Sequence, residues 1–321
     1  MSSNTELIRS MTLYGGFPIF ICGTIGNLLN IRCLWRNRHN PCVFIILSAS
    51  IINCIVLFYG LFTRILSVGF NLDWSSTNLI WCKTRVALSQ AGYFMSLTCV
   101  CLASIDRFLI SCRQEKYRNL SRLSFARWAV FVTIIFWLIH SLPELIYGTI
   151  IKNPYTGLTF CSVISPPAHM NYRLYISLPV YLGLLPSIIL IITGLMTYRN
   201  TNKLQITRQR EIIQKQLTKM MLIQIPIIVC STLPYVIFTE YTVFSATIIK
   251  TSNQRTIENI ITNIFTLLFY MSFACSFFVF FISSNSFRQE AKLFFLCHRT
   301  NLFRNIQIQP HPLPTIRDTT L

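Results

Sequence analysis

Seven long stretches of the chain lack Asp, Glu, Lys and Arg, and most of their residues are apolar. They cover residues 10–31, 39–63, 86–105, 128–143, 174–198, 220–239 and 259–287. A charge is costly at the centre of a bilayer, and a helix that crosses it needs about 20 predominantly apolar residues. The fourth stretch has only sixteen residues, but apolar residues continue past Glu144 to Ile151. The pattern therefore predicts seven transmembrane helices.

Composition favours a membrane protein over the alternative of buried helices in a soluble one. Hydrophobic residues make up 53% of the chain and charged residues 12%, whereas soluble domains carry about 25% charged residues. We predict an all-α membrane protein, a seven-transmembrane helix bundle with a short amphipathic eighth helix. The expected helices are 12–35, 42–66, 82–111, 124–150, 172–198, 213–248, 257–283 and 285–297. Residues 1–11 are expected to form an extracellular tail, and the polar, proline-containing residues 298–321 a disordered cytoplasmic one.

Basic residues predict the orientation in the membrane. The net charge is +18, and the charges flank the apolar stretches; a nucleic-acid-binding protein would instead carry them in stripes on a polar surface. Twenty of the 28 Lys and Arg residues lie on one side of the predicted membrane. Because basic residues favour the cytoplasm, we expect the N-terminus outside, the C-terminus inside and an inner face that attracts anionic lipids. The sequon Asn119-Leu120-Ser121 then lies in the cytoplasm, so we predict no glycan there.

The predicted topology leaves two of the twelve cysteines outside the cell, where disulfides form. Cys82 lies at the outer entry of the third helix, and Cys161 lies in the loop between the fourth and fifth helices. They are either two free thiols or a bond that holds this loop across the mouth of the bundle, and we predict the bond. Cys297, just past the seventh helix, is a candidate palmitoylation site.

Several short motifs lie at matching positions of the predicted helices. They are Gly26-Asn27 in helix one, Asp106-Arg107-Phe108 at the inner end of helix three, Trp137 and Pro143 in helix four, Pro186 in helix five, Leu233-Pro234-Tyr235 in helix six and Ser286-Phe287-Arg288 after helix seven. In combination they resemble the rhodopsin-like G-protein-coupled receptors over about residues 12–297. Within that family, helix three and the segment after helix seven are similar to invertebrate FMRFamide-type neuropeptide receptors.

The resemblance implies a plasma-membrane receptor that activates a heterotrimeric G protein and has no catalysis or cofactor of its own. Asp106 would hold Arg107 in the resting state, with Phe108 completing the motif. Outward movement of helix six, with its hinge at Pro234, would then release Arg107 to line the groove for a Gα helix. The alternatives are interfacial charges that reach toward the headgroups and a static proline kink.

The chain also departs from the family pattern. Cys230-Ser231-Thr232 precedes the helix-six Leu-Pro where an aromatic residue is usual, and Ser276-Phe277-Phe278-Val279-Phe280 replaces Asn-Pro-x-x-Tyr in helix seven. Helix two has no buried Asp, and Asn53 is the nearest polar residue, so we predict no cation site. Helix six begins with Gln214 and Lys215 rather than with an acid that could bridge to Arg107.

The ligand is constrained mainly by exclusion. Ser89 stands where amine receptors need an acid, and helix seven has no lysine for retinal, with Tyr270 at the corresponding position. The candidate ligand-binding residues are Arg64, Gln90, Glu144, Tyr147, Glu240, Tyr241 and Glu258. Glu144 and Glu240 either receive a guanidinium of a basic peptide or are solvated charges at helix ends. A short amidated peptide is the favoured ligand.

Two other classes of membrane protein compete with a receptor. A transporter or channel would need buried ionisable residues along a path through the helices, and the seven stretches lack Asp, Glu, Lys and Arg. His140 is the only histidine in helix four, and one histidine makes no relay. A membrane enzyme would need clustered His, Asp or Glu, and none resembles a metal site. We therefore predict no metal and no enzymatic activity.

Overall fold

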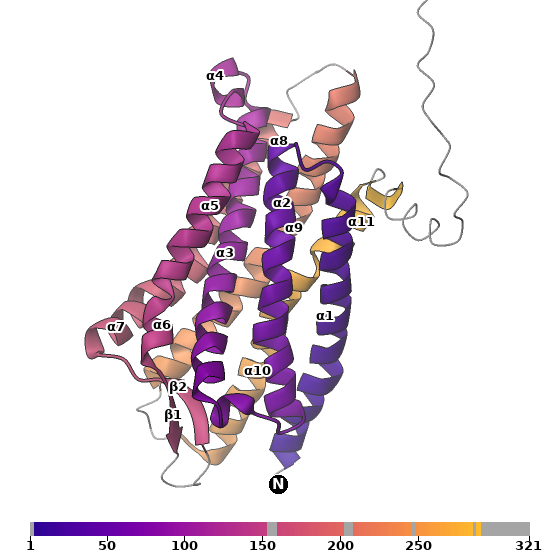
Figure 1. Ribbon diagram of the computed structural model, residues 1–321. Helices are drawn as coiled ribbons and strands as arrows, with labels where there is room; N and C mark the ends of the chain where they lie inside the picture. Colours follow the sequence, from indigo (N-terminus) through magenta and orange to yellow (C-terminus); the bar gives the residue numbers. More distant parts are fainter. Residues whose placement is uncertain are drawn as a thin grey trace, which may run out of the picture.

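The computed structural model describes residues 3–152, 159–201, 208–245, 248, 250–284 and 287–289. In these residues seven helical stretches are long and apolar enough to cross a membrane, and we number them spans one to seven. They are Thr5–Trp35, Pro41–Gly69, Leu79–Ser111, Leu123–Tyr147, Pro167–Thr201, Gln216–Phe244 and Ser252–Ala274. The predicted fold class, a multi-pass bundle of seven helices, is confirmed (Figure 1).

Each span consists of one or more helices. The first three contain α1 (Ser3–Trp35), then α2 (Pro41–Val56) with the π-helical η1 (Leu57–Phe62) and η2 (Ile65–Gly69), then α3 (Leu79–Ser111). Spans four and five are formed by α5 (Leu123–His140) and α6 (Leu142–Tyr147), then by α7 (Pro167–Tyr172), η4 (Arg173–Leu184) and α8 (Leu185–Thr201). Span six lies within α9 (Arg208–Phe244), and span seven is α10 (Ser252–Ala274). Helix α11 (Ser276–Ser283) continues span seven past Cys275 and is counted with it below. Helix α1 begins within the segment expected as an extracellular tail.

The two ends of the bundle carry different secondary-structure elements (Figure 1). One end carries the first turns of α1 and a hairpin of β1 (Gly148–Lys152) and β2 (Thr159–Val163). The other carries α4 (Glu115–Arg118), a short helix in the loop after α3. We call them the disulfide end and the Arg107 end, after the groups described below.

Local signals in the sequence explain where several helices begin and break. Asn40 caps α2, since its Oδ1 accepts hydrogen bonds from the backbone N–H groups of Cys42 and Val43, and Pro41 occupies the first turn. Span four changes from α5 to α6 at Ser141, two residues before Pro143, which has no N–H to continue the helix. Helix α9, in contrast, runs without a break through Pro226 and Pro234.

Span seven breaks at Cys275 without a proline. The carbonyl of Phe273 next to this break accepts a hydrogen bond from Asn27 Nδ2 of α1 at 3.0 Å. The two helices approach closely here, because a Cβ on Gly23 would lie 2.5 Å from the Cβ of Ala274. Gly23 therefore lets α1 pack closely against span seven, and Asn27 binds a backbone carbonyl next to the interruption of that helix.

The loop between spans four and five forms an antiparallel hairpin, in which Gly148 pairs with Val163 and Lys152 with Thr159. The sequence predicts a fourth helix that continues to residue 150. The helix ends instead at Tyr147. Gly148 is a poor helix former, and the β-branched residues that follow it, Thr149, Ile150 and Ile151, favour a strand.

The outer surface of the bundle suits hydrocarbon. Span four has the smallest buried share, 28% of its most apolar window. Its exposed side chains include Trp128, Phe131 and Ile139. An apolar surface of this extent in contact with water would be a liability, and in contact with lipid it is the expected outer face of a spanning helix.

Candidate functional site

A buried ion pair lies at the Arg107 end of α3. Arg107 is 2% exposed and Asp106 6% exposed, and Arg107 Nη2 lies 2.5 Å from Asp106 Oδ2. Phe108, the next residue, is half-buried, and its carbonyl accepts a hydrogen bond from Ser111 Oγ. A charge in a spanning helix is expensive unless it is paired, so this pair is a candidate functional site by its burial alone.

Two further residues complete the surroundings of this pair. Ser121 lies in the loop between α4 and α5, and its Oγ donates to Asp106 Oδ1 at 2.5 Å. Cys42, in the first turn of α2, lies next to the Arg107 guanidinium. The pair is thus held between span two, span three and the loop, and each carboxylate oxygen of Asp106 has its own donor.

Spans six and seven meet near the same end. Ser284, just after α11, donates from its Oγ to Oε1 of Gln216 in α9 at 3.0 Å. An open hollow of about 640 Å³ lies beside this contact, between the ends of spans one, two, six and seven. Gln214 and Lys215, noted in the sequence as neutral and basic, have side chains outside the described part of the structure. Among the described side chains Asp106 is the acid that pairs with Arg107.

Aromatic side chains connect spans three, six and seven in the middle of the bundle. Tyr235, which follows Pro234, stacks on Phe269 with ring centroids 4.3 Å apart. Phe269 also contacts Tyr93 of α3, whose hydroxyl lies 2.7 Å from that of Tyr270. The aromatic contact that the sequence lacks before the helix-six proline is therefore supplied by the residue after it.

Amides occupy the place of a buried carboxylate in helix two. Asn53 Nδ2 donates to Asn27 Oδ1 at 3.3 Å, and Ser96 Oγ donates to Asn53 Oδ1 at 2.5 Å. Ser276 Oγ also approaches Asn27 Oδ1, at 3.4 Å. Every member of this network is uncharged. No group of three or more His, Cys, Asp or Glu residues that could hold a metal occurs among the described residues.

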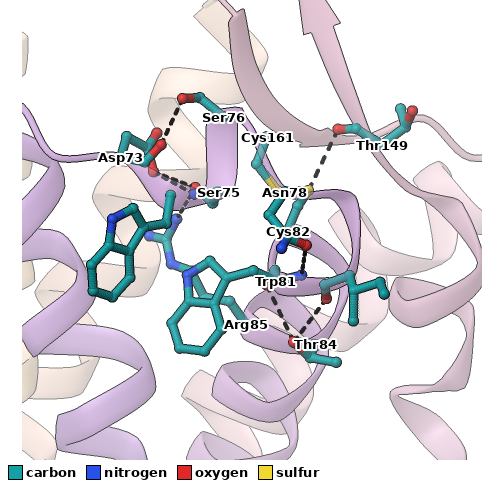
Figure 2. The surroundings of a disulfide bond; sticks show 12 residues. Asp73, Ser75, Ser76, Asn78, Trp81, Cys82, Thr84, Arg85, Thr149 and Cys161 are labelled. Atoms are coloured by element: carbon teal, nitrogen blue, oxygen red, sulfur yellow. Dashed lines mark hydrogen bonds between the residues drawn. A yellow bond between two sulfur atoms is a disulfide. The ribbon is translucent and has the colours of Figure 1, made fainter.

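Figure 2 shows the disulfide between Cys82 and Cys161, which the structure forms with a Cα–Cα distance of 5.6 Å. The predicted bond is confirmed. It ties the first turn of α3 to strand β2 and so holds the hairpin against the bundle. Beside it Arg85 Nη1 donates to Ser75 Oγ at 3.0 Å, and Ser75 in turn donates to Asp73.

Some of the candidate ligand residues already have partners at the disulfide end. Arg64 Nη2 donates to Asn263 Oδ1 at 3.0 Å. Glu258 accepts from Lys250 Nζ at 2.7 Å and from the Tyr241 hydroxyl at 2.9 Å. Lys250 and Glu258 border an open pocket of about 360 Å³ between α9 and α10.

The two acids expected near a basic ligand differ in their surroundings. Glu144 is fully buried; its Oε2 lies 3.4 Å from Arg173 Nη1 of η4, while its Oε1 has no hydrogen-bond partner among the described residues. Glu240 in α9 is half-buried, but both of its carboxylate oxygens are buried and have no hydrogen-bond partner among the described residues. Among the described residues, no hydrogen bond or ion pair joins the two acids through a common partner. Gln90 is half-buried, and Tyr147 contacts the ring of His169.

Two expectations concern the C-terminal segment. Cys297 and most of the expected eighth helix, including Ser286, lie outside the described residues. Phe287 is described, is buried and contacts the rings of Phe277 and Phe280.

Ser121 and Cys42 were not predicted as neighbours of the ion pair. Ser121 was considered only as part of a sequon, and Cys42 was not singled out. Asn40-Pro41 is a helix start signal, and it would have placed Cys42 in the first turn of helix two. No comparable local signal directs the Ser121 side chain to Asp106.

A family model described as 7 transmembrane receptor (rhodopsin family) matches residues 26–287, which is most of the chain. No curated protein matches the sequence.

Proposed function

Since the chain belongs to the rhodopsin family of seven-transmembrane receptors, we propose that it binds an extracellular peptide and activates a cytoplasmic heterotrimeric G protein. The observation that carries this proposal is the buried Asp106–Arg107 pair at the end of span three. A buried pair that is satisfied in one arrangement of helices and exposed in another gives the bundle two states.

The Arg107 end faces the cytoplasm in this proposal, and the disulfide end faces the outside. Arg32, Arg38, Arg113, Arg118 and Lys219 belong to the Arg107 end, as the excess of basic residues on the cytoplasmic side requires. The disulfide at the opposite end is consistent with an oxidising compartment.

Activation consists of an outward movement of span six (α9) at the Arg107 end. In the resting state Asp106 holds the guanidinium of Arg107, and the Gln216–Ser284 hydrogen bond holds α9 against the end of span seven. When α9 moves away, Arg107 can leave Asp106 and line a groove that receives a helix of the Gα subunit. Pro234 lets α9 bend, because it removes one backbone hydrogen bond from the helix.

The ligand is a short amidated peptide with a basic side chain, of the kind that FMRFamide-type receptors bind. Glu240 supports this proposal, since a carboxylate whose buried oxygens lack partners is costly until a cation pairs with it. Arg64, Gln90, Tyr241 and Glu258 contribute further polar groups on the same end of the bundle. Glu144 supports the fold through Arg173 instead.

Span six (α9) also connects the ligand to the G protein, through the stacked rings of Tyr235 and Phe269. Tyr235 lies five residues before Glu240 in α9, and its ring stacks on Phe269 of span seven. A ligand that pulls Glu240 therefore acts on the same helix, one and a half turns from the proline and its aromatic contact. This gives the differential contact between states that any ligand-driven shift requires.

Expression of the full chain in cells, with a library of amidated peptides and calcium and cyclic-AMP readouts, tests the function. We expect at least one arginine-containing peptide to give a response that Arg107→Ala abolishes while surface expression and peptide binding persist. An unchanged response in Arg107→Ala would contradict the proposed switch. Arg113→Ala, which removes an exposed arginine six residues away, is the matched control.

A further inference from the structure

Two half-buried arginines at the disulfide end have uncharged hydrogen-bond partners. Arg64 of span two donates from Nη2 to Asn263 Oδ1, and Arg85 of α3 donates to the hydroxyls of Thr63 and Ser75. In the described part of the chain neither arginine forms an ion pair. A guanidinium that is partly removed from water and has no counter-charge is costly, so this end of the bundle favours a group that brings a negative charge.

The contact between Arg64 and Asn263 leaves two donors unused. Arg64 Nε and Asn263 Nδ2 are buried, and neither has a hydrogen-bond partner among the described residues. Asn263 is 1% exposed, and its Oδ1 already accepts from Arg64 and from the hydroxyl of Thr12. Buried donors are costly until they meet an acceptor, and the oxygens of an anion are the strongest acceptors for them.

The shape of span two contributes to the position of Arg64. The residue lies between the π-helical segments η1 and η2, and a π-helical turn has more residues than an α-helical one, so the side chains after it are shifted around the helix axis. One turn earlier, Gly60 leaves room for the Tyr270 hydroxyl, since a Cβ there would lie 2.6 Å from its oxygen. Asn263 and Tyr270 lie seven residues apart and therefore on one face of α10. Polar groups of both spans thus follow one another along their contact.

We propose that Arg64 and Asn263 bind a carboxylate of the peptide ligand, so that the ligand carries an acidic group as well as the basic one assigned to Glu240. This deepens the proposed function and rests on it. In an arginine, Nε and an Nη nitrogen form the fork that matches the two oxygens of a carboxylate. The acid is bound between spans two and seven and the base on span six, which fixes the direction of the peptide.

The alternative is that Arg64 only ties span two to span seven. Replacing Asn263 by aspartate separates the two roles. The new side chain keeps the shape of the amide and the contact with Arg64, but its carboxylate supplies the negative charge that the ligand would otherwise bring. A purely structural Arg64 predicts that Asn263→Asp responds to peptides as the unmodified receptor does, whereas a carboxylate site predicts that the variant no longer prefers acidic peptides.

The probes are two positional-scanning libraries of synthetic hexapeptides, one with amidated and one with free C-termini, applied to cells that express the full chain. Calcium and cyclic AMP are the readouts. Pools with Asp or Glu at one position should be at least about tenfold more potent than pools with Asn or Gln there, as a charged hydrogen bond implies. An equal preference for free over amidated C-termini would place the carboxylate at the end of the peptide and support the site. Equal potencies in both comparisons would overturn it.

Four variants assign the preference to this site. Arg64→Gln and Asn263→Asp should each remove it, and Arg64→Glu should reverse it in favour of pools with Lys or Arg. Arg255→Gln removes an exposed arginine of α10 at the same end and should leave the preference unchanged. Surface labelling shows which variants reach the plasma membrane, and Asn263→Asp decides the question if the Arg64 variants do not. A preference for acidic pools that persists in Asn263→Asp would overturn the proposal.

The same screen separates this site from the proposed function. No response to any pool, with the receptor at the cell surface, would contradict a peptide receptor and the carboxylate site with it. A response that depends on Glu240 and on a basic residue of the peptide, with no preference for a carboxylate, would contradict the carboxylate site alone.

Discussion

Replacing Asp106 by asparagine should raise the activity of the receptor in the absence of ligand. The amide of the Asp106→Asn variant would keep an oxygen for Ser121 but lose the negative charge that faces Arg107, which is only 2% exposed. A hydrogen bond to a charged group contributes about 1.5–3 kcal/mol, and removing one partner of a buried pair costs about 3–5 kcal/mol. We take the smaller range, because the side-chain shape is preserved.

This free energy is lost from the resting state, in which the pair is formed, and not from the active state, in which Arg107 has left Asp106. Since 1.4 kcal/mol corresponds to a factor of ten, the ratio of active to resting receptor should rise about 10- to 100-fold. The assay is ligand-independent nucleotide exchange on the G protein, normalised to the amount of receptor at the surface. Glu115→Gln is the control, because Glu115 is an exposed acid of α4, in the loop that follows α3.

The result that would refute the reasoning is a basal activity of Asp106→Asn equal to that of the unmodified receptor, with a normal peptide response. It would show that the ion pair is formed equally in both states and stabilises the fold without acting as a switch.

Three further predictions concern other parts of the molecule. Cys82→Ser and Cys161→Ser should each reduce surface peptide binding, and the double variant should be no worse than either single one, because both remove the same bond; additive losses in binding assays would argue for separate roles. A receptor with Gln216→Cys and Ser284→Cys, whose native side chains are 3.0 Å apart, should bind peptide but not signal after oxidation, and recover after reduction; signalling in the fully cross-linked form would exclude movement of helix six. Glu240→Gln should lower peptide potency by more than about tenfold, and a peptide with citrulline in place of arginine should lose no further potency on this variant; additive losses would place the cation elsewhere.

The seven spans could be predicted because the signal is local. The absence of charge over about 20 residues reports the solvent of the segment itself, and no long-range contact has to be known. Topology then reduced the twelve cysteines to two, so the bond between Cys82 and Cys161 followed from the same local signal.

Contacts between distant segments could not be predicted in this way. Glu144 could be expected to face a ligand because its position near the end of helix four is visible in the sequence, while Arg173, 29 residues later, is its partner only in the fold. Ser121 and Asp106 are likewise brought together by the path of a loop. Asn27 binds the carbonyl of Phe273, 246 residues away, at a break that no proline marks.

The central claim is that binding of the peptide ligand moves span six (α9) away from Arg107 at the cytoplasmic end. A distance measurement between spectroscopic probes at Arg113 and Lys219 tests it most directly, since both side chains are exposed, one just after span three and the other on α9. The probes are introduced as noncanonical amino acids, which leaves the cysteines unchanged. We predict a longer distance on addition of peptide and a shorter one on its removal. An unchanged distance in a receptor that activates its G protein would contradict the account.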